Sequence, residues 1–164
     1  MNATVVVNPA ARGGAHTRAA ERAVARLTTL GIATPTVSGA SAAESTALLR
    51  HAVSGGTDAV IVVGGDGIIN LALQEVAGTA TPLGVVPAGN GNDFAREFGI
   101  PELEPEIAAD IIAAGHTRTI DLARATRADG STAVFGTVLA SGFDSYVNDR
   151  ANRMRILRGE ARYK

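Results

Sequence analysis

The sequence predicts an α/β fold built on an open, mostly parallel and doubly wound sheet, followed by the start of a β-rich second part. Short β-branched runs alternate with alanine-rich segments whose apolar residues recur with helical period. The segment at residues 58–63 is apolar throughout after Asp58 and lacks polar alternation, as expected of a central parallel strand covered by helices on both faces. With 164 residues, 46% of them hydrophobic, the chain can bury a sizeable core.

The order of elements follows from this alternation and from the residues that start and stop helices. Strands are expected at residues 4–7, 33–37, 58–63 and 83–86. Ala20, Val24, Leu27 and Leu30 share one face of the first helix, and Gly31 stands at its end. Later helices are expected from a capping box at Ser41 and Glu44 to Gly55 and Gly56, at residues 67–77 and 94–98, and from Pro105 to Gly115.

The rhythm changes after residue 117, where the pattern becomes β-rich. Residues 117–125 and 132–140 read as two strands, and Asp129 and Gly130 between them form a turn signal. These runs predict a hairpin in place of another βαβ unit. We therefore divide the chain into an α/β domain at residues 1–120 and the start of a second domain at residues 121–164.

The composition excludes several chemistries. Fourteen of the fifteen basic residues are arginine, and the only lysine is Lys164, so neither a Walker A lysine nor a protein-kinase strand lysine can exist. The sequence has no cysteine, and its histidines at positions 16, 51 and 116 are too scattered for a motif. No signal peptide or membrane-spanning run is visible, which predicts a cytoplasmic protein.

A glycine-rich motif, Gly64-Gly65-Asp66-Gly67, follows the most apolar strand and precedes a helix. This placement puts the motif at the carboxyl edge of the sheet, where open α/β folds bind ligands. Glycines let the backbone approach phosphates, and a helix N-terminus offers free N–H groups. A carboxylate there repels phosphate unless it holds Mg²⁺, a water or a sugar hydroxyl. The alternative is a plain strand-to-helix turn with Asp66 as its cap.

Two further loops are expected at the same edge. The next strand leads into residues 87–96, which read Pro-Ala-Gly-Asn-Gly-Asn-Asp-Phe-Ala-Arg, and the first strand leads into Asn8 and Pro9. Loops that follow adjacent strands can hold one nucleotide between them. Arg12 behind the first of these loops is either a phosphate contact or a solvated surface residue.

In these motifs the chain resembles the N-terminal domain of the diacylglycerol kinase catalytic-domain family, which also includes sphingosine and ceramide kinases. The resemblance covers essentially the whole chain, and its C-terminal stretch resembles actinobacterial members. It is carried by Asn8-Pro9, residues 64–70, residues 87–96, Thr119-Ile120-Asp121-Leu122 and Gly142-Phe143-Asp144, with residues 148–154 after them. Gly-Gly-Asp-Gly alone is shared with NAD kinases and phosphofructokinases.

The resemblance implies ATP-dependent transfer of the γ-phosphoryl group to the hydroxyl of a diacylglycerol-like lipid, with Mg²⁺ as the metal. Asp66 and Asp121 match essential acidic positions with a catalytic role, and Asp66 would hold the metal. Asp93 matches a third such position, where we expect it to orient its loop by accepting backbone N–H groups; Asp121 could instead be a plain strand-end residue. The positions that match ATP-contacting segments are Asn8, Pro9, Ala10, Ala11, Arg12, Ser38, Gly64, Gly65, Asp66, Gly67, Ile68, Ile69, Asn70, Gly89, Asn90 and Asp93.

Two departures from the family concern side chains: Ile68 and Asn90 stand where threonine is most frequent. A third concerns length, because the family's second domain, a β-sandwich that carries the general base, would lie beyond Lys164. The chain is thus expected to be the nucleotide-binding half, inactive alone. Two other hypotheses remain, a nucleotide-binding module without catalysis and an NAD kinase-like enzyme; residues 87–94 favour the lipid kinase over the latter.

The partners expected from the sequence are ATP, a diacylglycerol-like lipid and an anionic membrane surface, but no nucleic acid. Residues 148–164 hold six basic and two acidic side chains, which favours peripheral contact with the inner face of the membrane; a solvated helix face is the alternative. The apolar residues of 132–143 would leave an exposed edge that pairs with a second copy or stays mobile. We therefore expect a homo-oligomer through the β-rich end.

Overall fold

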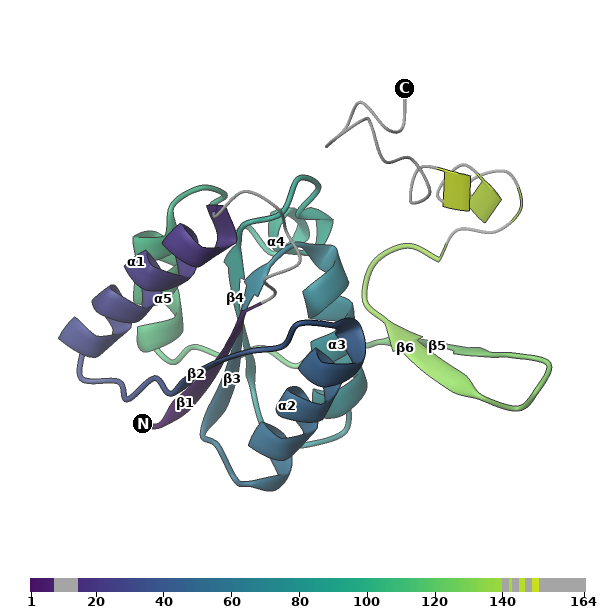
Figure 1. Ribbon diagram of the computed structural model, residues 1–164, viewed down its shortest axis with the longest axis horizontal. Helices are drawn as coiled ribbons and strands as arrows, with labels where there is room; N and C mark the ends of the chain where they lie inside the picture. Colours follow the sequence, from purple (N-terminus) through teal and green to yellow (C-terminus); the bar gives the residue numbers. More distant parts are fainter. Residues whose placement is uncertain (8–14, 140–141, 143–144, 147–148, 151–164) are drawn as a thin grey trace.

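A computed structural model of the chain describes residues 1–7, 15–139, 142, 145–146 and 149–150 (Figure 1). It contains five helices and six strands within these ranges. The strands are β1 (Ala3–Val7), β2 (Thr36–Ser38), β3 (Ala59–Gly64), β4 (Leu83–Pro87), β5 (Ala123–Thr126) and β6 (Thr132–Phe135). The helices are α1 (Ala15–Thr29), α2 (Ala42–Ser54), α3 (Asp66–Val76), α4 (Asp93–Glu97) and α5 (Pro105–Ala113).

The main sheet has four parallel strands in the order β2-β1-β3-β4. This confirms the predicted α/β class with its parallel sheet. The register aligns the ends of three strands, because Val7 pairs with Val63 and Gly64 pairs with Pro87. The loops after β1, β3 and β4 therefore start at one edge of the sheet.

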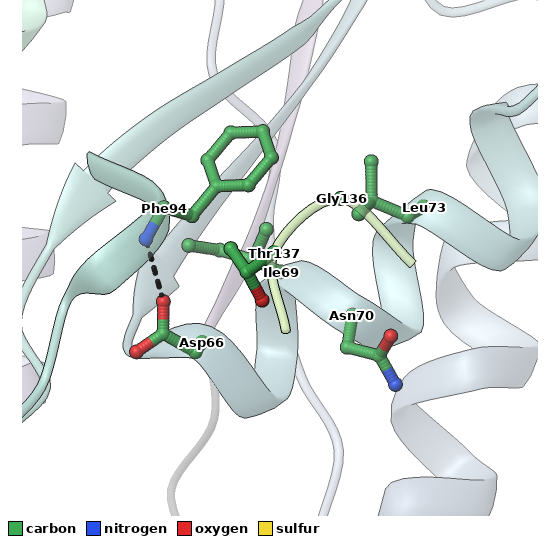
Figure 2. A pocket seen from close by; sticks show the side chains of 7 residues that line it. All are labelled: Asp66, Ile69, Asn70, Leu73, Phe94, Gly136 and Thr137. Carbon is green, nitrogen blue, oxygen red and sulfur yellow. Dashed lines mark hydrogen bonds between the residues drawn. The ribbon is translucent and has the colours of Figure 1, made fainter. Parts of the chain in front are cut away.

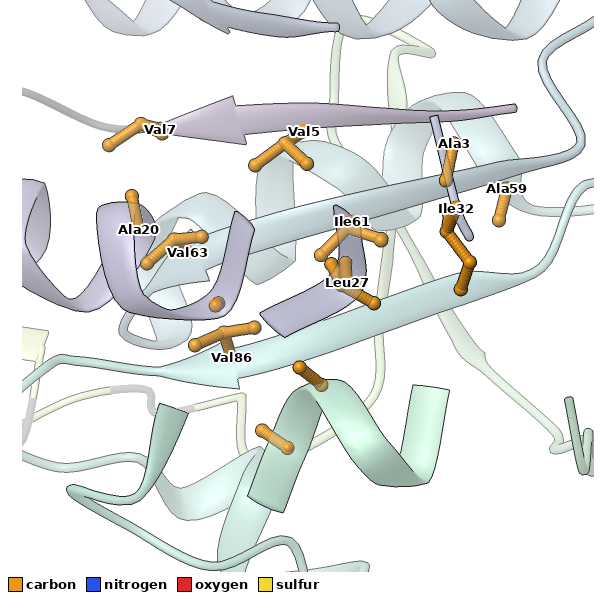
Figure 3. Close-up of a cluster of buried hydrophobic side chains, with 13 residues drawn as sticks. Ala3, Val5, Val7, Ala20, Leu27, Ile32, Ala59, Ile61, Val63 and Val86 are labelled. Atoms are coloured by element: carbon orange, nitrogen blue, oxygen red, sulfur yellow. The ribbon is translucent and has the colours of Figure 1, made fainter. Parts of the chain in front are cut away.

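Helices cover both faces of this sheet, as Figure 1 shows. Side chains of β3 point alternately to the two faces of the sheet. Because helices cover both faces, all of its residues are buried, and all of them are apolar. Ile61 and Val63 pack with α1 and α5 in one core, which includes Leu27 (Figure 3). Val60 and Val62 pack with α2 and α3 in the other. The doubly wound arrangement follows directly from this apolar strand.

The predicted helix ends are confirmed in α2. The Ser41 hydroxyl accepts the backbone N–H of Glu44 at 3.1 Å, and the Glu44 carboxylate accepts the backbone N–H of Ala40 at 2.8 Å. Ser41 thus satisfies an N–H group that the helix start leaves free, and Glu44 holds the residue before the cap. The helix ends at Ser54 with Gly55 as its cap, and Gly56 follows with φ of 76°.

Two expectations about the first βαβ unit were wrong. Residues 33–37 were expected as one strand, but β2 spans only Thr36–Ser38, and Ala33 forms a separate bridge with Asn2. Pro35 between them has no N–H to donate, although its carbonyl accepts the Val5 N–H at 2.9 Å. Leu30 was placed on the buried face of α1, but it lies past the helix end and is 40% exposed. Ile32 is buried in its place, and its N–H donates to the Leu27 carbonyl at 3.0 Å.

The predicted hairpin exists, but it is shorter than expected. β5 and β6 pair antiparallel, with Ala123 opposite Phe135 and Thr126 opposite Thr132, whereas residues 117–122 and 136–139 lie outside both strands. Gly130 in the turn has φ of 82°, a conformation that glycine adopts readily. The expected turn signal is therefore correct, and the strand boundaries were too wide.

The hairpin is attached to the α/β part through α3. The Gln74 side chain donates to the Val134 carbonyl at 2.7 Å and accepts the Val134 N–H at 3.0 Å, as a neighbouring strand would. Ile120, Leu122 and Val134 pack against the core under α3. Sequence reasoning anticipated a free or self-pairing edge here, but one edge of β6 is occupied by Gln74 of the same chain.

Candidate nucleotide site at the carboxyl edge of the sheet

The two predicted glycine-rich loops begin side by side. β3 and β4 are hydrogen-bonded neighbours whose last paired residues are Gly64 and Pro87, and the Ala88 N–H donates to the Gly64 carbonyl at 2.9 Å. β1 ends at the same edge, next to Val63. The third predicted loop, with Asn8, Pro9, Ala10, Ala11 and Arg12, lies outside the described residues.

Gly65 and Gly89 bring the two loops into backbone contact. A Cβ atom on Gly89 would lie 2.4 Å from the Gly65 Cα, and one on Gly65 would lie 3.0 Å from the Gly89 Cα. Carbon atoms do not approach to 2.4 Å without a shift of the backbone. Both glycines are therefore required by the packing of the loops, independently of any ligand.

Asp66 joins the same two loops through its carboxylate (Figure 2). Its Oδ1 accepts the Phe94 N–H at 2.9 Å, and its Oδ2 accepts the Asp93 N–H at 3.2 Å, so it holds the first turn of α4. Sequence reasoning gave this task to Asp93. The Asp93 side chain is instead 67% exposed and accepts a hydrogen bond from Arg96 at 2.9 Å. The physical reason is position, because Asp93 starts α4 whereas Asp66 faces it from α3.

Asn92, Arg96 and Glu102 form a network that sequence reasoning missed. The Asn92 side chain is 1% exposed and bonds to both backbone groups of Gly89 and to Glu102. Arg96 donates to the Gly91 carbonyl at 2.5 Å and to Glu102 at 3.3 Å. The pKa of Arg96 is raised above its usual value, mainly by the hydrogen bond to Asp93 and next by the negative charge of Glu102. The sequence did not indicate that the Asn92 side chain is buried, because an asparagine before an aspartate is typical of an exposed turn.

The other predicted site residues differ in exposure. Gly67, Asn70 and Asn90 are exposed, and a Cβ placed on Gly67 would have no other segment of the described chain within 4 Å. Ile68 and Ile69 are 1% and 2% exposed, so they offer a ligand mainly their backbone groups.

Two predicted residues lie on other segments. Ser38 is exposed at the end of β2, which β1 separates from β3. Asp121 is exposed between Ile120 and Leu122, whose side chains pack against the core.

A small pocket lies beside Asp66, between α3, α4 and the segment after β6 (Figure 2). Its lining residues are Asp66, Ile69, Asn70, Leu73, Phe94, Gly136 and Thr137. The pocket encloses about 20 Å³, room for about one water molecule. Gly136 closes its wall, because a Cβ there would lie 3.0 Å from the Phe94 ring. Within the described residues, no group of three or more acidic or histidine side chains could hold a metal by itself.

This arrangement, an open parallel α/β sheet with two touching glycine-rich loops and an aspartate at one edge, is typical of α/β domains that bind ligands at the carboxyl ends of their strands. The sequence model described as "Diacylglycerol kinase catalytic domain" matches residues 2–125. The chain is 52% identical over 160 residues to a diacylglycerol kinase of Mycobacterium tuberculosis, and the alignment covers 98% of this chain and 52% of the relative. It is 31% identical over 122 residues to a diacylglycerol kinase of Bacillus subtilis, and that alignment covers 73% of this chain and 40% of the relative.

Solved structures agree with the sequence comparisons. A crystal structure of a diacylglycerol kinase from Bacillus anthracis superposes with a TM-score of 0.64 and 26% identity, covering 74% of this chain and 44% of that one. The chain thus belongs to the diacylglycerol kinase catalytic-domain family. It spans about half the length of the curated relatives it matches. Among the described residues, no helix combines the length and apolarity that a membrane span needs.

Proposed function

We propose that the protein takes part in ATP-dependent transfer of a γ-phosphoryl group to the hydroxyl of diacylglycerol, giving phosphatidic acid, or to the hydroxyl of a related lipid. Membership of the family supports the kinase class, and two kinds of relative, named diacylglycerol kinase and probable lipid kinase, support a lipid acceptor. We further propose that the residues described here form the nucleotide-binding part of such an enzyme and give no turnover by themselves. We also propose that the nucleotide-binding domain ends at residue 120 and that a second domain starts at residue 121.

The observation that carries this proposal is the contact between the loops after β3 and β4. Gly65 and Gly89 touch, and Asp66 binds the backbone of residues 93 and 94, so the two loops form one continuous surface. The N-terminus of α3 opens onto this surface at Gly67, where no other segment among the described residues comes within 4 Å of a Cβ placed on the glycine. Free N–H groups of a helix start are favourable partners for phosphate.

Mg²⁺ fits this site in the usual manner of nucleotide enzymes, in which one or two carboxylates, waters and substrate phosphates share the metal. Each Asp66 oxygen accepts one backbone N–H and has a second lone pair, so the carboxylate could still accept a metal-bound water. When bound, the metal would neutralise phosphate charge. Asp66 is the proposed metal residue, and Asp121, exposed and attached to the same core, is the second proposed catalytic carboxylate.

The remaining contacts are proposed by position. Asn8, Pro9, Ala10, Ala11 and Arg12 would approach the nucleotide from the end of β1, and Ser38 from the end of β2. Around the loop contact, the proposed set also includes Gly64, Ile68, Ile69, Asn70, Asn90 and Asp93. Asn90 and Asn70 are exposed and offer amide groups, whereas Ile68 would act through its backbone.

Binding of a fluorescent ATP analogue in the presence of Mg²⁺ tests the proposed site. Gly67→Val extends into the space above the α3 start, where a Cβ meets no other segment among the described residues, and valine is no worse than glycine in a helix. We expect at least about tenfold weaker binding and an unfolding midpoint no lower than that of the wild type. Ala25→Val, at an exposed position of α1, is the matched control and should bind as the wild type does. Equal affinity of Gly67→Val and the control would contradict the site.

The proposed partners beyond the nucleotide concern the C-terminal part. Most of the basic stretch at residues 148–164, which we propose contacts anionic lipid at the inner face of the membrane, lies outside the described residues. Self-association through the β-rich end is also proposed. Val138 and Leu139, which are 82% and 60% exposed, offer apolar surface for it, whereas β6 has one edge occupied by Gln74.

A further inference from the structure

Asn92 combines two unusual properties for a residue in a loop. Its side chain is 1% exposed, and Ser45 is the other buried polar residue in the described part of the chain. Its backbone is left-handed, with φ of 54°. Asparagine tolerates this conformation better than most residues, but glycine adopts it at lower cost. The backbone alone therefore does not explain an asparagine at this position.

The hydrogen bonds of the side chain give the explanation. The Asn92 Oδ1 accepts the Gly89 N–H at 2.9 Å, and the Nδ2 donates to the Gly89 carbonyl at 2.9 Å. The second proton of Nδ2 is directed at Glu102 Oε2, at 3.0 Å. The amide thus pairs with both backbone groups of one residue, as a neighbouring strand would, and three of its four bonding positions are used.

Gly89 is enclosed between Asn92 and Gly65. A Cβ on Gly89 would lie 2.9 Å from the Asn92 Oδ1 and 2.4 Å from the Gly65 Cα. Any movement of Gly89 therefore either breaks its two bonds to Asn92 or changes the contact with Gly65. The Asn92 amide therefore restrains Gly89 at the loop contact, beside the bonds that Asp66 makes to residues 93 and 94.

Glu102 and Arg96 hold the amide itself. The Glu102 carboxylate accepts from Asn92 with one oxygen and from Arg96 with the other, and Arg96 also donates to the Gly91 carbonyl. The segment between α4 and α5 is thereby tied to the loop after β4. A fixed amide in turn fixes Gly89, because buried hydrogen-bonded groups are costly to separate.

We propose that Asn92, oriented by Glu102, is a positioning residue that holds Gly89 against Gly65 and so fixes the two nucleotide-facing loops before a ligand arrives. This role rests on the proposed function. A loop that is ordered in advance does not lose its conformational freedom on binding, so affinity is higher than for a loop that orders with the ligand. Asn92 need not touch the nucleotide, since its side chain is buried.

The first test is the affinity of Asn92→Gly for the fluorescent ATP analogue with Mg²⁺. Glycine keeps the left-handed backbone and removes only the side chain, so we expect about tenfold weaker binding by a folded protein. Thr57→Ala is the control for lost stability. The Thr57 hydroxyl bonds to Thr4, Asn2 and Ala59 at the opposite edge of the sheet, so its loss should leave affinity unchanged.

A rescue experiment separates positioning from general stability. Asn92→Asp keeps the acceptor for the Gly89 N–H but places a carboxylate against Glu102 and the Gly89 carbonyl, so binding should weaken by more than about tenfold. Adding Glu102→Gln supplies a new donor to that carboxylate, and we expect the double variant to recover most of the affinity. Binding by the double variant no better than by Asn92→Asp would overturn the role of the pair.

Hydrogen exchange of the Gly89 amide gives a readout that needs no ligand. We expect a protected amide in the wild type and in Thr57→Ala, and a rapidly exchanging one in Asn92→Gly. Rapid exchange in the wild type, or equal affinity of Asn92→Gly and wild type, would overturn the positioning role alone. Absence of nucleotide binding by the wild type, with Gly89 protected, would instead overturn the proposed function and, with it, the reason for this positioning.

Discussion

The Phe94 N–H donates to the Asp66 carboxylate at 2.9 Å, across two loops that lie 28 residues apart in sequence. The proposed metal residue is therefore also part of the fold at the site. A single substitution at Asp66 affects both properties, and experiments on it need a stability measurement beside any activity measurement.

Asp66→Asn should destabilise the protein as well as weaken nucleotide binding with Mg²⁺. An amide offers one acceptor oxygen and one donor nitrogen, so either the Asp93 or the Phe94 N–H loses its partner. We expect a cost of about 1–3 kcal/mol in the free energy of unfolding, measured by urea denaturation. Asp121→Asn is the comparison, because Asp121 is exposed and its change should leave stability within about 0.5 kcal/mol. Equal stability of Asp66→Asn and wild type would show that the loop bonds are weak.

Gly89→Ala should disturb the loop contact, whereas Gly67→Ala should not. The new methyl group on residue 89 would lie 2.4 Å from the Gly65 Cα, so we expect a loss of about 1–3 kcal/mol in the free energy of unfolding. At Gly67 the methyl group meets no other segment among the residues that the structure describes, and we expect a gain of up to about 1 kcal/mol. Thermal denaturation of the two variants measures the difference, and similar midpoints would contradict the close approach of the loops. For the same reason Gly65 substitutions cannot separate binding from packing.

Gln74→Ala should free the hairpin from α3. Two hydrogen bonds to the Val134 backbone disappear, so we expect faster hydrogen exchange at Val134 by a factor of about ten or more. Exchange in β3 should not change, because that strand is buried under both helical layers. Gln74→Glu, which keeps the acceptor for the Val134 N–H but loses the donor, should give an intermediate rate. An unchanged rate in Gln74→Ala would mean that apolar packing alone holds the hairpin.

Charge reversal of the basic C-terminal residues should weaken binding to vesicles that contain anionic lipid. Each arginine near such a surface contributes about 1 kcal/mol, and the attraction falls as salt rises. Vesicle sedimentation of the wild type and of a variant with Arg150, Arg153, Arg155 and Arg158 changed to glutamate measures the effect. The same variant on neutral vesicles is the control. Binding that responds to neither salt nor charge reversal would remove the electrostatic account.

The fold could be predicted from the sequence where one pattern determined one structure. Val60, Ile61 and Val62 form an unbroken apolar run, which only a strand covered on both faces can bury. The predicted start of β2 was wrong because Pro35 lacks an N–H and interrupts the strand within an otherwise β-like run. The predicted place of Leu30 on the helix face was wrong because the apolar spacing continues past the end of α1, where Gly31 turns the chain with φ of 78°.

The proximity of the two glycine-rich loops could be predicted from the sequence, but the hydrogen bonds between them could not. The order of strands and glycine-rich turns gave Gly65, Asp66 and Gly89 correctly as neighbours at one edge. We expected Asp93 to accept the backbone N–H groups of its loop, but Asp66 accepts them. The sequence could not show which of the two carboxylates faces the start of α4, because two adjacent loops allow either arrangement. The burial of Asn92 depends on Glu102, in a segment that shows no motif, so no local pattern could reveal it.

Helix α3 has a consequence for how the hairpin lies relative to Asp66. Asp66 occupies its first position and Gln74 its ninth, which corresponds to about 12 Å along the helix axis. One end of this helix contacts the loop after β4, and the other end carries β6. Between these two contacts the helix is fixed in the core by Ile69, Ala72 and Leu73. The hairpin and the aspartate are thus held at a set distance from one another by one helix, although neither touches the other.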